Sequence, residues 1–216
     1  MKLKISKEFL IFSIIVIVSI LGLLFFMKTS YFDSIQIWAQ QNLILYLLFI
    51  TLIKILGIVY PPFSGGILTL GSIPVIGWEL AYFTDFVGST VGGIANYFLA
   101  KKYGKNIIRK FLGPEAERKI SSIKIKKGRE IESIIVTRIF VGSVVLELIH
   151  YVAGILHIKF SQYLIGIIIS HVIVGIPSFY LFSNIFENRG SLTIISIFLI
   201  LLAVPILYKL KGRYFE

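Results

Sequence analysis

Cysteine is absent from this chain of 216 residues, and only three histidines are present. Without cysteine the chain forms no disulfide, thiolate nucleophile, iron–sulfur cluster or cysteine-based zinc site. The histidines, His150, His157 and His171, form no HExxH or HxH pair, so we expect no metal site and no cofactor. No recognisable nucleic-acid-binding motif accompanies the positive charge, and we expect no nucleic acid as a partner.

Charged residues are also scarce. They make up 15% of the chain, whereas hydrophobic residues make up 56%, above the roughly 45–50% apolar content of ordinary soluble domains. The first apolar run, Phe9 to Met27, has 19 uncharged residues, more than the roughly 7–15 of a signal-peptide core, and no small-residue cleavage site follows it. The composition predicts an integral membrane protein, and this run predicts a retained anchor helix.

Two of the later apolar tracts are interrupted. The tract 42–78 is broken at 61–66, where Pro61, Pro62, Gly65 and Gly66 lie, and the tract 131–160 is broken near Gly142. The halves on either side of a break are shorter than the roughly 20 residues of a spanning helix. Irregular backbone survives inside a membrane only where protein buries it or where it lines a wet cavity. We therefore expect two re-entrant hairpins.

The fold class that follows is an all-α integral membrane protein with an inverted repeat of two re-entrant helical hairpins. Each hairpin is followed by a transmembrane helix, and such repeats place a binding site near the membrane midplane. Further transmembrane helices are expected at both ends of the chain. The expected divisions are an anchor helix and external loop (1–41), a transport domain (hairpin 42–78, helix 80–100, basic loop 101–130, hairpin 131–160, helix 161–183) and a C-terminal helix with a basic tail (184–216). Two unrelated kinked hairpins that merely pack together are the alternative.

Positive charge is distributed unevenly over the expected loops. The N-terminus, the 101–130 segment and the C-terminus hold 17 Lys and Arg residues, against two on the opposite side. This bias predicts a multi-pass protein of the cell membrane with both termini in the cytoplasm. It does not distinguish hairpins from full spans, which have the same parity. The 101–130 segment is expected to begin a helix at Gly113 and Pro114 and to lie against anionic lipid head groups.

Acidic residues inside the apolar tracts are candidates for transport or proton coupling. Asp85, Gly88, Gly92 and Asn96 share one narrow face of the expected 80–100 helix. Because a lipid-facing charge costs about 2.5–3.5 kcal/mol, this face is expected to point into the bundle. Glu79 follows Trp78, so an interfacial carboxylate is its alternative role.

The second hairpin holds a similar group. Glu147, His150, Tyr151 and Gly154 would share a helix face, and a Glu and a His one turn apart can exchange a proton. Arg138 suits bidentate binding of a phosphate, with an ion pair to Glu147 or Asp85 as the alternative.

Two further residues complete the set of candidates. Lys54 is a second phosphate candidate, or it reaches the interface along its aliphatic stem. His171 precedes Gly175 and Pro177 in a helix expected to be bent. A packed, hydrogen-bonded role is expected for this histidine.

Three motifs resemble the DedA and VTT-domain (SNARE-associated Golgi protein) family. They are GSTVGGIANYFLAKKYG at 88–104, TRIFVGSVVLELIHYVAGI at 137–155 with GIPSFYLF at 175–182, and PPFSGGILTLGSIPVIG at 61–77. The resemblance covers about 42–183. This chain departs from the family pattern at several positions. Gly93 stands where members often carry an acid, and Lys101 where they carry arginine. Val141 lies near a usual proline, and Glu147 and His150 stand where asparagines are common.

The resemblance implies two facing re-entrant hairpins and lipid translocation, by flipping of polyprenyl-phosphate carriers or scrambling of phospholipids. Membrane lipids with anionic head groups are then the expected partners, and buried titratable residues are compatible with proton coupling, with Asp85 as a substitute for the acid absent at Gly93. The alternatives are a transporter of a small ion or solute, and a non-transporting scaffold. An enzyme is not expected, and the sequence does not identify the lipid, the coupling ion or the oligomeric state.

Overall fold

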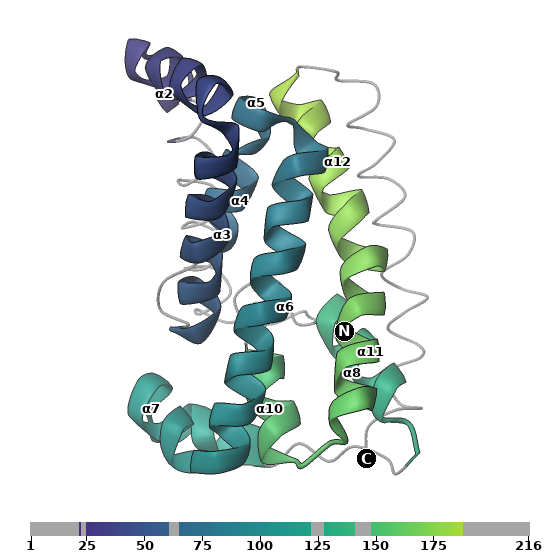
Figure 1. Cartoon of the computed structure of the whole chain (residues 1–216). Coiled ribbons are helices and arrows are strands. Elements are labelled where there is room, and N and C mark those ends of the chain that lie inside the picture. Colours follow the sequence, from purple (N-terminus) through teal and green to yellow (C-terminus); the bar gives the residue numbers. More distant parts are fainter. Residues whose placement is uncertain (1–21, 23–24, 61–64, 122–127, 141–147, 188–216) are drawn as a thin grey trace, which may run out of the picture.

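The structure is a computed structural model that describes residues 22, 25–60, 65–121, 128–140 and 148–187. All secondary structure in these residues is helical, which confirms the all-α class (Figure 1). The predicted C-terminal helix, most of the predicted N-terminal helix, and Pro61, Pro62, Gly142 and Glu147 lie outside the described residues. Below, the upper end of the bundle is the end of Figure 1 at which α2 lies, and the lower end is the one at which α7 lies.

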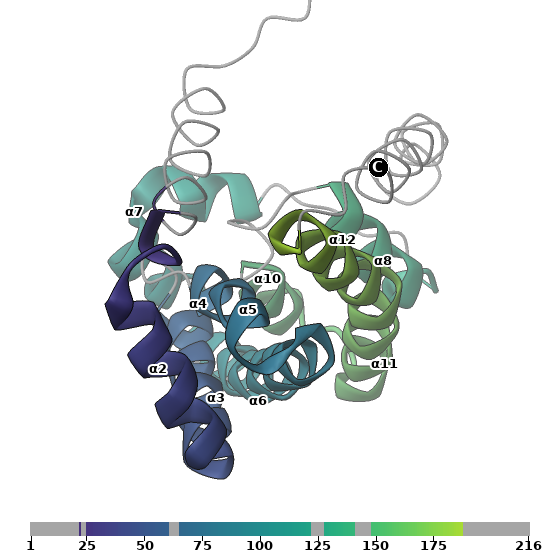
Figure 2. The same ribbon diagram turned by 90° about the horizontal axis from the view of Figure 1, so that it is seen from above.

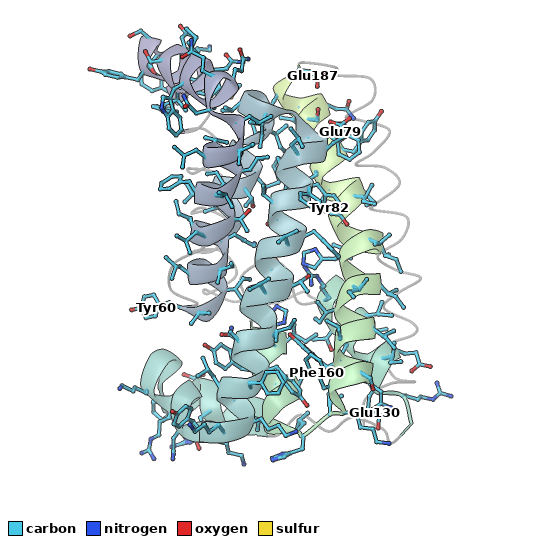
Figure 3. All side chains as sticks on the ribbon, viewed as in Figure 1. Tyr60, Glu79, Tyr82, Glu130, Phe160 and Glu187 are labelled. Carbon is cyan, nitrogen blue, oxygen red and sulfur yellow. The ribbon has the colours of Figure 1, made fainter. Side chains whose placement is uncertain are left out.

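The first hairpin begins at the upper end. Helix α2 (Ser30–Gln41) meets α3 (Leu43–Val59) at a 110° bend. An external loop was expected where α2 lies. This segment is helical instead, and its apolar residues Phe32 and Ala39 are buried with Tyr46 and Val75 of the hairpin. Helix α3 then descends, and Tyr60, which follows it, lies toward the lower end (Figure 3).

The chain returns upward through two short helices, α4 (Gly65–Gly71) and α5 (Ile73–Ile76). These run antiparallel to α3, because Tyr46 donates a hydrogen bond to Ser72 at 3.1 Å and Gln36 donates to the Pro74 carbonyl at 3.2 Å. Both ends of this hairpin therefore face the upper end of the bundle. The predicted break residues Gly65 and Gly66 form the first turn of α4.

Helix α6 (Trp78–Tyr103) runs the length of the bundle, slightly beyond the expected 80–100. Seen along the helices, it lies between α3 and α11 (Figure 2). Helix α7 (Lys105–Ser121) follows at the lower end, with a kink at Gly113 (φ 84°) before Pro114. A helix was expected to begin at Gly113 and Pro114. In the structure, the second part of α7 begins there, after the kink.

The second hairpin opens at the lower end. Helix α8 (Glu130–Phe140) begins at Glu130, near the lower end, and α10 (Leu148–Ile155) leads back toward Phe160 (Figure 3). Helix α8 rises beside α11, since Gln162 donates to Glu130 at 3.4 Å and Ile134 packs against Gly166.

A continuous helix follows this hairpin. It comprises α11 (Phe160–Ser170), the π-helical segment η1 (His171–Gly175) and α12 (Ile176–Phe186). Its 27 residues are long and apolar enough to cross a membrane, and it is the single such helix in the described part of the chain. The bent pair of α2 and α3 passes the same test when it is counted as one span.

Glycines let the helices approach closely at three places on α6. A Cβ on Gly88 would lie 2.7 Å from Lys54 Cβ, and one on Gly92 would lie 2.8 Å from Ile58 Cβ. A Cβ on Gly154 of α10 would overlap the Tyr97 carbonyl oxygen. Small residues at such contacts let backbones pack directly against each other.

We expect Gly154→Ala to destabilise the protein by roughly 1–3 kcal/mol, because the added methyl group must displace the backbone of α6. The measurement is the free energy of unfolding in detergent. The matched control is Gly22→Ala, where no atom of the described residues lies within 4 Å of the added Cβ. Equal stability of the two variants would contradict the close contact between α6 and α10.

Candidate functional site

A buried ion pair joins the first hairpin to α6. Lys54 Nζ lies 2.9 Å from Asp85 Oδ1, and both side chains are about one-tenth exposed or less. The expectation that Lys54 reaches the interface is therefore wrong. Its stem is buried between Gly65 and Gly88, whose missing side chains leave room for it. Asp85 supplies the countercharge that burial of an ammonium group requires.

Thr69 completes the environment of the Asp85 carboxylate. Its hydroxyl lies 2.7 Å from Asp85 Oδ1 and 3.0 Å from the Gly66 carbonyl, and it is fully buried. Because one hydroxyl has a single proton, it donates to the carboxylate or to the carbonyl at a given moment. Either way α3, α4 and α6 meet at one carboxylate oxygen. The apolar context of Thr69 in the sequence gave no signal of this role.

The second charged contact joins α8 to η1. Arg138 Nη2 lies 2.7 Å from His171 Nε2, with the two residues 8% and 1% exposed. Arginine only donates hydrogen bonds, so Nε2 accepts and the imidazole is neutral. Among the residues that the structure describes, Arg138 Nε and Nη1 and His171 Nδ1 are buried with no hydrogen-bond partner.

The expected ion pair of Arg138 with Asp85 is not formed, because Asp85 is in contact with Lys54 and Thr69. The pair with Glu147 falls outside the described residues. Three donors of a buried cationic contact thus lack acceptors in the described part of the chain, and such donors are available to an anion.

The two charged contacts lie at a common level of the bundle. Phe86, which follows Asp85, packs edge-on against the His171 ring with centroids 5.5 Å apart. Tyr82, one turn above on α6, packs against Gly175 and lies 3.4 Å from the His171 carbonyl. His171 lies near the middle of the 27-residue apolar helix.

His150 belongs to a separate buried group, one level lower. Its Nδ1 lies 2.7 Å from the Tyr163 hydroxyl, and Tyr163 stacks on Tyr97 with centroids 4.8 Å apart. A Cβ on Gly93 would lie 2.6 Å from the His150 ring. The side chain of His150 therefore occupies the space beside position 93, where the family resemblance places an acid in other members.

The remaining candidates make no charged contact with Arg138 or His171 in the described residues. Glu79 is exposed at the upper end of the bundle (Figure 3). This location is compatible with its alternative role as an interfacial carboxylate. Gly88, Gly92 and Asn96 lie with Asp85 on the face of α6 that packs against α3, and Asn96 donates to the Ile58 carbonyl at 2.6 Å.

The described residues form an all-helical bundle with a buried layer of charge and one helix that is long and apolar enough to cross a membrane. Residues 52–184 match the sequence profile of the VTT domain. This range is more than half of the chain, which therefore belongs to the VTT domain family. The family resemblance noted from the sequence motifs is confirmed.

A relative from Methanocaldococcus jannaschii, itself uncharacterized, is 26% identical over 120 residues, which are 53% of this chain and 70% of that protein. No solved structure gives a significant match.

We expect Asp85→Asn to destabilise the protein by roughly 3–5 kcal/mol, because Lys54 would keep its charge without a buried partner. Thermal unfolding in detergent measures this change. Glu79→Gln, which removes an exposed carboxylate of the same helix, is the control and is expected to have little effect. The double variant Lys54→Met with Asp85→Asn should regain most of the loss. A stable Asp85→Asn protein with no benefit from Lys54→Met would refute the structural role of the ion pair.

Proposed function

We propose that this protein is an integral membrane protein that moves phosphate-bearing lipids across the membrane, as a flippase or scramblase of phospholipids or polyprenyl phosphates. Membership of the VTT domain family and the apolar helix 160–186 support the membrane location. The observation that supports lipid phosphate as the ligand is the buried guanidinium of Arg138, which has two nitrogens without partners among the described residues.

The directions of the two hairpins support a transport path between them. The α3–α5 hairpin opens toward the upper end, and the α8–α10 hairpin opens toward the lower end (Figure 1). Helix α6, with 26 residues, would be about 39 Å long, enough to cross a bilayer core of about 30 Å. The described length of α8, 11 residues, is about 16 Å.

We infer that the hairpins form an inverted repeat, with the charged level near the midplane. A lipid head group at this level would replace its hydrogen bonds to water by hydrogen bonds to buried donors, while the lipid tails stay in the membrane. Arg138 contributes planar, charge-assisted hydrogen bonds suited to phosphate. Lys54 contributes less than the sequence suggested, because Asp85 already neutralises it.

Proton coupling is a further part of this proposal. Asp85, Glu147, His150 and Glu79 are the candidates that the sequence offers, and Asp85 and His150 are buried. Uptake of a proton by Asp85 would remove the countercharge of Lys54 and loosen the contact of α3 with α6. A transporter of a small anion would use the same guanidinium without carrying lipid tails.

The lipid proposal is tested by Arg138→Lys and Arg138→Ala in liposomes with labelled phospholipid. Lysine keeps the charge and loses the planar fork, so we expect translocation to fall by at least about tenfold, and further with alanine. Melting temperature is measured on the same preparations and should change by only a few degrees with lysine, because no described carboxylate depends on Arg138.

Loss of activity strictly in step with loss of stability would assign Arg138 a structural role only. Liposomes loaded with phosphate or chloride provide the second arm. Release of these ions by the parent protein, with no lipid movement, would replace the lipid proposal by transport of a small anion.

The orientation is tested in the same cysteine-free background. We propose that both termini and the 101–130 segment face the cytoplasm of a cell-membrane protein, because positive charge gathers there. Asn106→Cys on α7 and Ser34→Cys on α2 are both exposed positions at opposite ends of the bundle. An impermeant thiol reagent added to intact cells should label position 34 and spare position 106. The reverse pattern would invert the topology.

A further inference from the structure

We propose that His171 is the residue through which proton binding is linked to phosphate binding at Arg138. This inference deepens the proposed function and rests on it. From the sequence, only a packed, hydrogen-bonded role was expected for this histidine. The inference gives it a positioning role that changes with its protonation state.

The contact requires a neutral imidazole. Arg138 Nη2 and His171 Nε2 are 2.7 Å apart, and a guanidinium has no acceptor. Protonation of Nε2 would set a donor against a donor and a cation against a cation. The direct contact would then break, and the guanidinium would turn away from η1.

Charged and titratable groups of four elements face His171. Arg138 approaches from α8, Asp85 and Tyr82 belong to α6, Lys54 belongs to α3, and His150 belongs to α10. Asp85 is the single carboxylate among them in the described residues, and it is already in contact with Lys54 and Thr69. A positive charge on His171 would therefore share this one described carboxylate with Lys54, so it has no countercharge of its own within the described bundle.

An anionic phosphate supplies that countercharge. One phosphate oxygen can accept from both Nε2–H of a protonated His171 and Nη2–H of Arg138, which turns a repulsive contact into a bridged one. Arg138 Nε and Nη1 have no hydrogen-bond partner among the described residues and can donate to other phosphate oxygens. Binding of the phosphate thus favours binding of the proton, and the proton favours binding of the phosphate by the same factor.

The backbone at His171 departs from regular α-helix. Residues His171–Gly175 form a π-helical turn, a geometry that is often found at functional sites. The Tyr82 ring packs directly against Gly175, where a Cβ would lie 2.7 Å from Tyr82 Cε2. The ring of His171 is thereby packed between Phe86 and the arm that carries Arg138.

The test measures phosphate affinity in detergent by calorimetry at about pH 5.5 and about pH 7.5, on either side of the ordinary titration of histidine. The probes are a short-chain phosphatidylglycerol and dimethyl phosphate, both phosphodiesters that stay singly charged. We expect the parent protein to bind more tightly at the lower pH by a factor on the order of ten. Preference for the lipid over dimethyl phosphate would assign the site to lipid, and equal binding would assign it to the phosphodiester alone.

His171→Gln keeps a hydrogen-bond acceptor near the Nε2 position and cannot be protonated. We expect this variant to bind the probes with equal affinity at both pH values. The control is His157→Gln, the same change at an exposed histidine outside the buried group, and it should keep the pH dependence of the parent. A normal pH profile in His171→Gln would overturn the inference.

A second measurement on the parent protein avoids dependence on the variant. Histidine labelled with ¹⁵N reports the protonation of His171 directly, and addition of dimethyl phosphate near pH 6.5 should shift its ring signals toward the protonated form. No shift on saturation with the probe would overturn the inference. Phosphate binding without any pH dependence would do so as well, while leaving the lipid proposal intact.

Discussion

The buried ion pair of Lys54 and Asp85 is the interaction on which the arrangement of the first half depends. A charge in this position is tolerated only with a close partner, and the partner is on a different helix. The pair therefore fixes the height of α3 relative to α6. Gly88 and Gly65 follow from the same constraint, because the aliphatic stem of Lys54 passes between them with no room for a Cβ. Thr69 adds α4 to the contact through a single oxygen of Asp85.

The second half resolves its buried charge differently. Arg138 meets a neutral histidine, so its positive charge is not cancelled by contact with any described carboxylate. In the first half Asp85 neutralises the charge of Lys54, whereas in the second half His171 contacts Arg138 without neutralising it. Both halves bring a basic residue to the same level, and this difference is the reason why the proposed phosphate site lies on the Arg138 side of the bundle.

Much of the framework could be predicted from the sequence, because hydrophobic pattern and length are local properties. The helix expected at 80–100 is found at 78–103, and the one at 161–183 is found at 160–186. The glycine face of α6 was recognisable from spacing. The pairing of the buried charges could not be predicted, since it depends on which helices become neighbours. Lys54 was a candidate for binding phosphate or for reaching the interface, and Asp85 was an alternative partner of Arg138. Helix α2 was missed because its polar residues read as a loop, while the two residues that it buries pack on a distant part of the chain.

The positions of the two histidines show why composition alone could not assign their roles. His150 and His171 are equally buried, yet His150 shares a hydrogen bond with a neutral hydroxyl, whereas His171 is held against a permanent cation. The Tyr163 hydroxyl can donate or accept, so a change of protonation at His150 needs only a reversal of that hydrogen bond. At His171 no reversal is available, because arginine cannot accept. A proton there must either be excluded or be accompanied by an anion, and for this reason the proposed link between proton and phosphate lies at the contact of α8 with η1.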